Sequence, residues 1–163
     1  MEGRKIIGIM GPGEGATTAD IDAAFEVGQL MAESGYLVLT GGRASGVMEA
    51  AMKGAKSAGG TTIGILPSED GADQSEYVDI PIKTGMGSAR NNINVLTSDT
   101  IIGIGVDAGT ISEIALAIKA NKLVLLLNWT ESSKAFFENI ETAKLTFFNN
   151  PDELINYIQA SEK

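Results

Sequence analysis

The segment Gly105–Glu113 carries residue types that could bind phosphate or take part in catalysis. Gly109 gives a ligand access to the backbone, and the hydroxyl of Thr110 can cap a helix or contact phosphate. Glu113 lies three residues further on, where its carboxylate could return to the Thr110 N–H as a capping box. For Glu113 alone, this structural role and a catalytic role therefore both remain open.

Four apolar runs in the sequence end in glycine-rich turns that could each open a helix. The turns are Gly11–Gly15, Gly41–Gly46, Gly85–Ser88 and Gly105–Thr110. Glycine lets the backbone approach a ligand closely, and the first N–H groups of a helix have no intrahelical partners. One such turn could simply shorten a strand-to-helix connection. Several of them along one edge of a sheet indicate a basin suited to phosphate.

The composition limits the chemistry and the partners of this 163-residue chain. Twelve basic and 21 acidic residues give a net charge of −9, which argues against a nucleic-acid surface. An anionic ligand would therefore need local attraction from backbone N–H groups and from Arg43, Lys83 or Arg90. The absence of cysteine and histidine excludes disulfides, thiol nucleophiles, Cys/His zinc sites and Ser-His-Asp arrangements.

The apolar segments are too short to suggest a membrane protein. The stretch after Arg4 and Lys5 is short and interrupted by glycine, as expected for a first strand rather than a signal peptide. We therefore expect a cytoplasmic protein with neither membrane nor nucleic-acid partners.

Strand and helix patterns alternate along the chain without a linker, which predicts one domain over residues 1–163. We expect an α/β fold with a doubly wound, mostly parallel sheet and helices on both faces. The predicted helices cover 18–34, 46–58, 88–98, 110–120, 132–140 and a segment from 151, and the later strands cover 61–66, 77–82, 100–104, 123–127 and 145–148.

Residues 68–76 are predicted to form an exposed, mobile loop. The predicted apolar stripes are Ile21, Phe25, Leu30 and Met31 in the first helix, and Ile111, Ile114, Ala115 and Ile118 in the fourth.

Three segments resemble the Lonely Guy, or lysine-decarboxylase-like, family of Rossmann-like nucleotide-binding proteins. They are the turn and helix start Gly41–Met48, then Arg90, then Gly105–Glu113, within a similarity that runs from Lys5 to about Leu127. The enzymes of this family are phosphoribohydrolases that release a base from a nucleoside 5′-monophosphate. By this resemblance Arg90 would hold the phosphoribosyl group. Glu113 would assist departure of the base by stabilising positive charge on the ribose or by orienting water.

The chain departs from the hydrolase pattern around both residues. It has Gly105-Val106-Asp107 in place of Pro-Gly-Gly, which adds a carboxylate beside the predicted anion site, and it lacks the His and Lys that flank the family's arginine. A second branch is more similar. Gly11-Pro12-Gly13, Gly46–Ala50 and Thr84–Asn91 resemble the molybdenum cofactor carrier proteins, which hold, protect and pass on a phosphorylated pterin.

The second resemblance implies a carrier that binds, protects and transfers the phosphorylated molybdenum cofactor (molybdopterin), without catalytic residues. The ligand would lie in a glycine-rich anion basin at the carboxyl ends of the strands. A homo-oligomer (dimer or tetramer) and a molybdoenzyme acceptor are also implied. The alternatives are a cytokinin-activating nucleoside 5′-monophosphate phosphoribohydrolase, with Arg90 and Glu113 as catalytic residues, and a non-catalytic nucleotide-binding sensor.

The residues predicted to bind the ligand are glycine, polar, charged or methionine residues in or just beyond the four turns. They are Gly11, Gly13, Gly15, Gly41, Gly42, Arg43, Ser45, Gly46, Gly85, Met86, Arg90, Gly105, Asp107, Gly109, Thr110 and Glu113. We expect the phosphate between Gly41-Gly42 and Gly109-Thr110. Met86 is the methionine predicted to touch the ligand, the others being core residues, and no metal site is predicted.

Overall fold

Parallel strands form the centre of the protein in the computed structural model, which describes residues 3–140 and 144–161. Within these residues seven strands form one sheet in the order β4-β3-β2-β1-β5-β6-β7, and all their pairings are parallel. The strands are β1 (Ile6–Met10), β2 (Leu37–Thr40), β3 (Thr62–Leu66), β4 (Ile80–Lys83), β5 (Thr100–Ile104), β6 (Leu123–Leu127) and β7 (Leu145–Phe148). Residues 1–2, 141–143 and 162–163 of the predicted domain lie outside the described residues.

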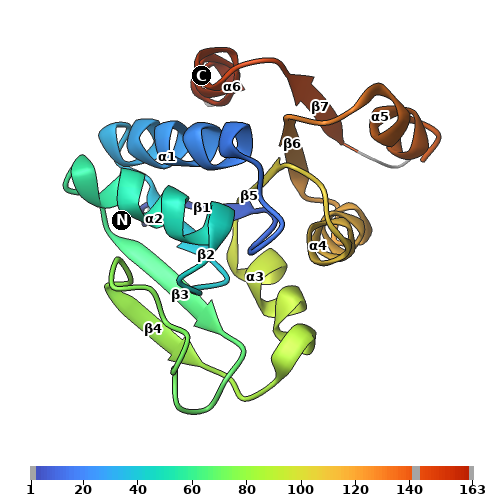
Figure 1. Cartoon of the computed structure of the whole chain (residues 1–163). Coiled ribbons are helices and arrows are strands. Elements are labelled where there is room, and N and C mark those ends of the chain that lie inside the picture. The colour runs from blue at the N-terminus through green and yellow to red at the C-terminus, as the bar shows by residue number, and fades with distance from the viewer. Residues whose placement is uncertain (1–2, 141–143, 162–163) are drawn as a thin grey trace.

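Helices cover both faces of the sheet, which confirms the predicted doubly wound α/β fold (Figure 1). One face carries α1 (Thr18–Glu33), α2 (Gly46–Ser57) and α6 (Pro151–Ser161), and the other carries α3 (Asn91–Thr97), α4 (Ala108–Lys119) and α5 (Glu131–Glu138). A short 3₁₀ helix, η1 (Gly87–Arg90), precedes α3.

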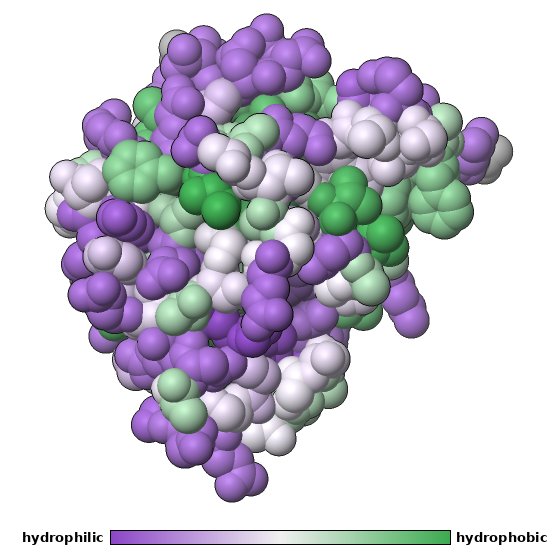
Figure 2. Space-filling model, in the orientation of Figure 1, coloured by the Kyte–Doolittle hydropathy of each residue, from purple (hydrophilic) through white to green (hydrophobic). Residues whose placement is uncertain are grey.

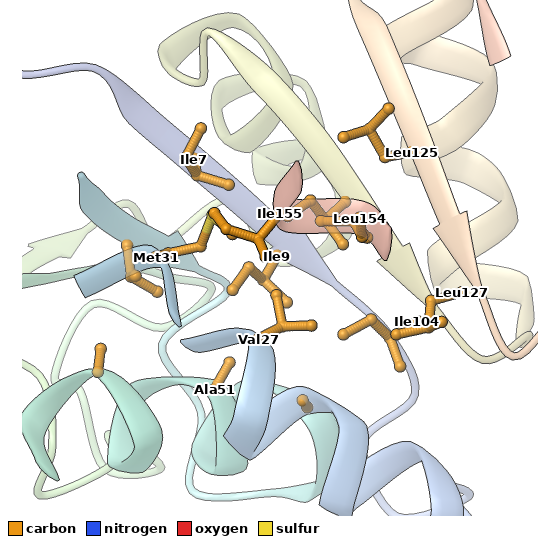
Figure 3. Packing of buried hydrophobic residues seen from close by; sticks show 14 of the residues in the cluster. Ile7, Ile9, Val27, Met31, Ala51, Ile104, Leu125, Leu127, Leu154 and Ile155 are labelled. Carbon is orange, nitrogen blue, oxygen red and sulfur yellow. The ribbon is translucent and has the colours of Figure 1, made fainter. Parts of the chain in front are cut away.

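Successive strand residues supply two separate apolar cores, because side chains alternate between the faces of a strand. Ile102 and Ile104 belong to the core under α1, α2 and α6, whereas Ile101 belongs to the core under α3 and α4. Figure 3 shows Ile7 and Ile9 of β1 in the first of these cores. Burial on both faces accounts for the nearly continuous apolar sequence of β6.

Helices α1 and α2 touch through glycine rather than through large side chains. A Cβ on Gly28 of α1 would collide with the carbonyl oxygen of Ala51, and a Cβ on Gly54 of α2 would collide with that of Phe25. The small residues of α2 therefore serve close packing against a neighbouring helix as well as against the sheet.

The predicted inward faces of α1 and α4 are partly wrong. Ile21 is 40% exposed and Ile111 is 39% exposed, and Ala115 is exposed as well. The buried residues are Asp20, Ala24, Val27, Gly28 and Met31 in α1, and Thr110, Glu113, Ile114, Ala117 and Ile118 in α4. Because α1 packs against α2, the side of α1 that carries glycine and alanine faces inward. In α4 two of the buried residues are polar, so a prediction based on the spacing of apolar residues cannot identify them.

The segment predicted as an exposed loop over 68–76 is hydrogen-bonded to the turn after β2. The Ala44 N–H donates to the Asp73 carbonyl at 2.8 Å, and the Ser75 N–H donates to the Gly42 carbonyl at 3.0 Å. Ser75 is fully buried. The backbone of this segment thus makes specific contacts that hold the β2 turn.

The sequence Asn150-Pro151-Asp152 is typical of a helix start, and the Glu153 N–H donates to the side chain of Asn150 at 2.9 Å, which caps the last helix. Trp129 is a packing residue: it is 7% exposed, and its indole N–H donates to the Gly103 carbonyl at 3.2 Å. No helix within residues 3–140 and 144–161 has the length and apolar character needed to cross a bilayer.

Candidate functional site

The strand order places a topological switch point between β1 and β5. The chain leaves β1 for α1 on one face of the sheet and leaves β5 for α4 on the other face, so the two connections diverge. Ligands of open α/β sheets bind in the crevice that such divergence leaves at the carboxyl ends of the strands. Gly11 and Gly13 follow β1 here, and Asp107 and Gly109 follow β5.

A cavity of about 170 Å³ lies at this switch point. It is lined by residues from four connections: Gly11, Gly13, Arg43, Met48, Ser88, Arg90, Asn91, Asp107, Gly109, Thr110 and Glu113. Figure 2 shows a hydrophilic recess near the middle of this face of the molecule. Turns that are far apart in the sequence thus meet at one polar site.

Eight of the sixteen residues predicted to bind the ligand line this cavity, namely Gly11, Gly13, Arg43, Arg90, Asp107, Gly109, Thr110 and Glu113. The other eight do not line it, namely Gly15, Gly41, Gly42, Ser45, Gly46, Gly85, Met86 and Gly105. At several of these glycines an added Cβ would meet atoms of residues that do not line the cavity. A Cβ on Gly85 would lie 2.6 Å from the side chain of Glu69, and one on Gly105 would lie 2.8 Å from the carboxylate of Asp20.

The glycines after β2 are not among the residues that line the cavity. Gly42 has a φ of +76°, and a Cβ there would lie 3.0 Å from the Cα of Gly64 on β3. The Gly41 carbonyl accepts a hydrogen bond from Arg90 Nη2 at 3.4 Å. The predicted phosphate position between this turn and Gly109-Thr110 therefore remains a prediction, and the cavity lining favours Gly11 and Gly13 as the nearer turn.

Three cavity residues are absent from the predicted set: Met48, Ser88 and Asn91. Met48 is 8% exposed and lines the cavity from the first turn of α2, whereas Met86 is 50% exposed and does not line it. Both Met48 and Asn91 stand inside the sequence motifs that resemble the carrier proteins. Their position in the first turn of a helix that follows a glycine turn is the signal that could have identified them.

The guanidinium of Arg90 is held inside the protein by neutral acceptors. Nε donates to the Ile65 carbonyl and Nη1 donates to Asn91 Oδ1, both at 2.7 Å, and Nη2 reaches the Gly41 carbonyl. Within residues 3–140 and 144–161 no carboxylate lies within 4.0 Å of it. Burial lowers the pKa of Arg90, and the charge of Glu113 opposes this shift. An arginine has five N–H donors, so this arrangement fixes the guanidinium and leaves two donors for an anion.

Glu113, on the neighbouring helix α4, is a buried acid that lines the same cavity. It is 8% exposed, and Oε1 accepts a hydrogen bond from Asn94 Nδ2 at 2.8 Å. Burial raises the pKa of Glu113 to about 7; Asp107 adds to the shift, and the Asn94 hydrogen bond and Arg90 oppose it. The carboxyl group therefore changes charge near neutral pH.

The capping box that the spacing of Thr110 and Glu113 allows does not form. Asp107 is the N-cap of α4, and its Oδ1 accepts both from the Thr110 N–H and from the Thr110 hydroxyl, each at 2.7 Å. Because α4 begins at Ala108 rather than at Thr110, Glu113 lies in the second turn and faces Asn94 of α3. Its side chain is therefore available to the cavity.

Arg43 is the second cation at the cavity, and it is already paired. Its Nε donates to Asp73 Oδ2 at 2.8 Å, and both side chains remain more than one third exposed. Such a solvated pair leaves part of the arginine's charge to act on the cavity. The site therefore combines one buried, rigid guanidinium with one exposed, shared guanidinium.

Residues 4–155 match the sequence description of the SLOG cluster4 family. The chain belongs to the SLOG cluster4 family. An uncharacterized protein from Archaeoglobus fulgidus is 40% identical over 155 residues, which cover 95% of each chain. The resemblance inferred from the glycine turns and Arg90 is thus confirmed at family level.

Two solved structures are closely similar to this SLOG cluster4 protein. The molybdenum cofactor binding protein from the phototrophic bacterium Rippkaea orientalis is 48% identical over the whole of both chains, with a TM-score of 0.97. The molybdenum cofactor carrier protein from Chlamydomonas reinhardtii is 43% identical over 97% of this chain and 98% of that one, with a TM-score of 0.92. Both share the doubly wound sheet.

Proposed function

We propose that this protein binds the phosphorylated molybdenum cofactor in the cavity between the ends of β1 and β5, protects it and passes it to an acceptor. The observation that carries the proposal is the buried guanidinium of Arg90, fixed by Ile65, Gly41 and Asn91 with donors left for an anion. The full-length similarity to a molybdenum cofactor binding protein and to a carrier protein supports this choice of ligand.

The size and chemistry of the cavity fit the phosphate end of such a ligand. Its volume of about 170 Å³ is below the roughly 300–1,000 Å³ of pockets that enclose a whole drug-sized ligand. The phosphate would therefore enter the cavity, and the pterin would extend over its rim, where an acceptor could reach it. Ser88, Asn91 and Thr110 add neutral hydrogen-bonding groups to the same walls.

The assembly and the place of action belong to the same proposal. We expect a cytoplasmic homo-oligomer, a dimer or a tetramer, that delivers the cofactor to a molybdoenzyme. Size-exclusion chromatography with light scattering would measure the oligomeric state of the purified chain.

The proposal is tested by identifying the bound ligand. The protein is purified from a host that makes the molybdenum cofactor, and the small molecules released on denaturation are identified by mass spectrometry. We expect a molybdopterin in near-stoichiometric amount from the wild type and a strongly reduced amount from Arg90→Gln. A ribonucleotide in its place would contradict the carrier function and favour a nucleotide-binding sensor.

A second candidate function, nucleoside 5′-monophosphate phosphoribohydrolase, is favoured by one observation. Arg90 and Glu113 line the same cavity, and a carboxyl group with a pKa of about 7 could act as an acid or a base near neutral pH. Incubation with adenosine monophosphate and quantification of adenine tests this function. Under the carrier proposal no adenine appears above background, whereas steady turnover that is lost in Glu113→Gln would establish the hydrolase.

A further inference from the structure

Helices α2, α3 and α4 begin at the cavity, and the first turns of α2 and α4 are capped differently. The N-cap of α2 is Ser45, whose side chain makes no capping hydrogen bond. The N-cap of α4 is Asp107, whose Oδ1 accepts two hydrogen bonds from Thr110 at 2.7 Å. A carboxylate thus occupies the start of one helix, and the start of the other carries no side-chain acceptor.

Asp107 is partly buried at the cavity. Asp107 lines the cavity together with Gly109, Thr110 and Glu113, and its charge contributes to the raised pKa of Glu113. A Cβ placed on Gly109 would meet one atom, the Asp107 Oδ1, at 3.4 Å. Apart from the neighbouring residues of the turn, this carboxylate is the group that a side chain on Gly109 would meet.

The donors that Asp107 uses are those an anion would use at this end of the cavity. The N-terminus of a helix attracts both carboxylates and phosphates, because the same N–H groups and the same dipole serve either of them. An N–H group that donates to Asp107 cannot donate fully to a ligand at the same time. A carboxylate next to a bound phosphate would also repel it within the cavity.

We propose that Asp107 is an internal competitor of the ligand's phosphate group. Its carboxylate occupies the anion position at the start of α4, the phosphate displaces it on binding, and it returns to Thr110 as the phosphate leaves. This role rests on the proposed function in taking the ligand to be a phosphorylated molecule. Competition by Asp107 lowers the affinity for phosphate. It also favours release, because the Thr110 N–H and hydroxyl donate to Asp107 again as soon as the phosphate leaves.

The proposal is tested with inorganic phosphate as the probe, titrated calorimetrically into the full-length protein. Asp107→Asn keeps a capping oxygen and removes the charge, and we expect its affinity for phosphate to rise about tenfold. Glu14→Gln is the matched control, because it removes the same charge from the neighbouring, exposed turn after β1; its affinity should change less than about twofold. Asp107→Gly removes the competing oxygen and should also bind more tightly, although its unliganded melting temperature should fall.

The displacement itself is followed at the Thr110 backbone amide. Saturating phosphate should shift the NMR resonance of this amide in the wild type, because its acceptor changes. Equal or weaker phosphate affinity in both Asp107 variants, or no saturable binding by any of the proteins, overturns the proposal. Recovery of a molybdopterin from the wild type is a separate measurement, so the carrier function and this role of Asp107 can each fail without the other.

Discussion

The turns after β2 and after β5 both contain conspicuous glycines, yet the structure uses these glycines differently. Gly42, after β2, adopts a φ of +76°, and its missing side chain leaves room for the Cα of Gly64 on the next strand. Gly109, after β5, has no positive φ, and its missing side chain leaves open space beneath Asp107. One glycine is needed by the fold, and the other makes room at the cavity.

The difference teaches how to interpret a glycine at the end of a strand. The residue type alone does not distinguish backbone conformation, packing and ligand access, because glycine permits all three. What separates them is the set of atoms that an added Cβ would meet. At Gly42 it would lie 2.8 Å from Leu66 Cδ2 and 3.0 Å from the backbone Cα of Gly64, whereas at Gly109 it would lie 3.4 Å from the Asp107 side chain. Adding a methyl group at each position tests the comparison directly.

The largest effect is expected for Gly42→Ala. The left-handed φ strains any residue with a side chain, and the new Cβ would press against β3, so the free energy of unfolding should fall by about 4 kcal/mol. Urea unfolding followed by circular dichroism measures it. A loss below about 1 kcal/mol would show that the turn relaxes easily, and the assignment of Gly42 to the fold would then be wrong.

A somewhat smaller effect is expected for the part of the pH dependence of stability that Glu113 contributes on the β5 side. The folded-state pKa of Glu113, about 7, lies above its ordinary value of 4.5. Its contribution to stability is therefore complete below about pH 4.5 and is lost as the pH rises through 7, a loss on the order of 3 kcal/mol. Glu113→Gln should remove this part of the pH dependence and be the more stable protein at pH 8. Parallel stability curves for the two proteins between pH 5 and 8 would contradict the buried ionisation.

Arg90 joins the two turns, because it donates to the Gly41 carbonyl and lines the cavity with Glu113. Arg90→Gln should weaken binding of a phosphorylated ligand about thirtyfold and binding of its dephosphorylated form less than about threefold, because a charge-assisted contact is lost. Calorimetric titration with both ligand forms measures the ratio. Equal losses for the two forms would assign Arg90 a structural role only.

The smallest effect is expected for Gly109→Ala, the counterpart of Gly42→Ala. Alanine suits the first turn of a helix at least as well as glycine, so stability should stay within about 1 kcal/mol of the wild type. The methyl group would crowd the cavity beside Asp107, and the affinity for inorganic phosphate should fall about fivefold. If the phosphate affinity of this variant is unchanged, the phosphate does not bind at the start of α4.

The order of the elements could be predicted from the sequence because each strand and helix carries its own local signal. The uniformly apolar run Leu123–Leu127 indicated a buried strand, and Asn150 before Pro151 indicated the last helix start. The inward faces of α1 and α4 could not be obtained in the same way. The face of α1 follows from contact with α2 at Gly28, and Thr110 and Glu113 are buried although they are polar.

The candidate site was predictable as a set of turns but not as a set of contacts. Arg90 and Glu113 could be singled out by type and motif, whereas their partners Ile65, Gly41 and Asn94 depend on tertiary packing. The alternative of a capping box at Glu113 could not be resolved from the sequence, because a helix boundary shifted by two residues changes which carboxylate reaches the Thr110 N–H. Boundaries of this kind are the least certain part of a prediction from local sequence.

The central position of β1 determines when, during synthesis, the cavity can first be complete. β1 can pair with β2 once Thr40 has left the ribosome, but its other edge has no partner until β5, which begins at Thr100, has emerged. A shorter nascent chain exposes an open strand edge, and one wall of the cavity is missing from it. Because Asp107, Gly109, Thr110 and Glu113 follow β5, a ligand that needs the whole cavity can bind only after these residues have emerged.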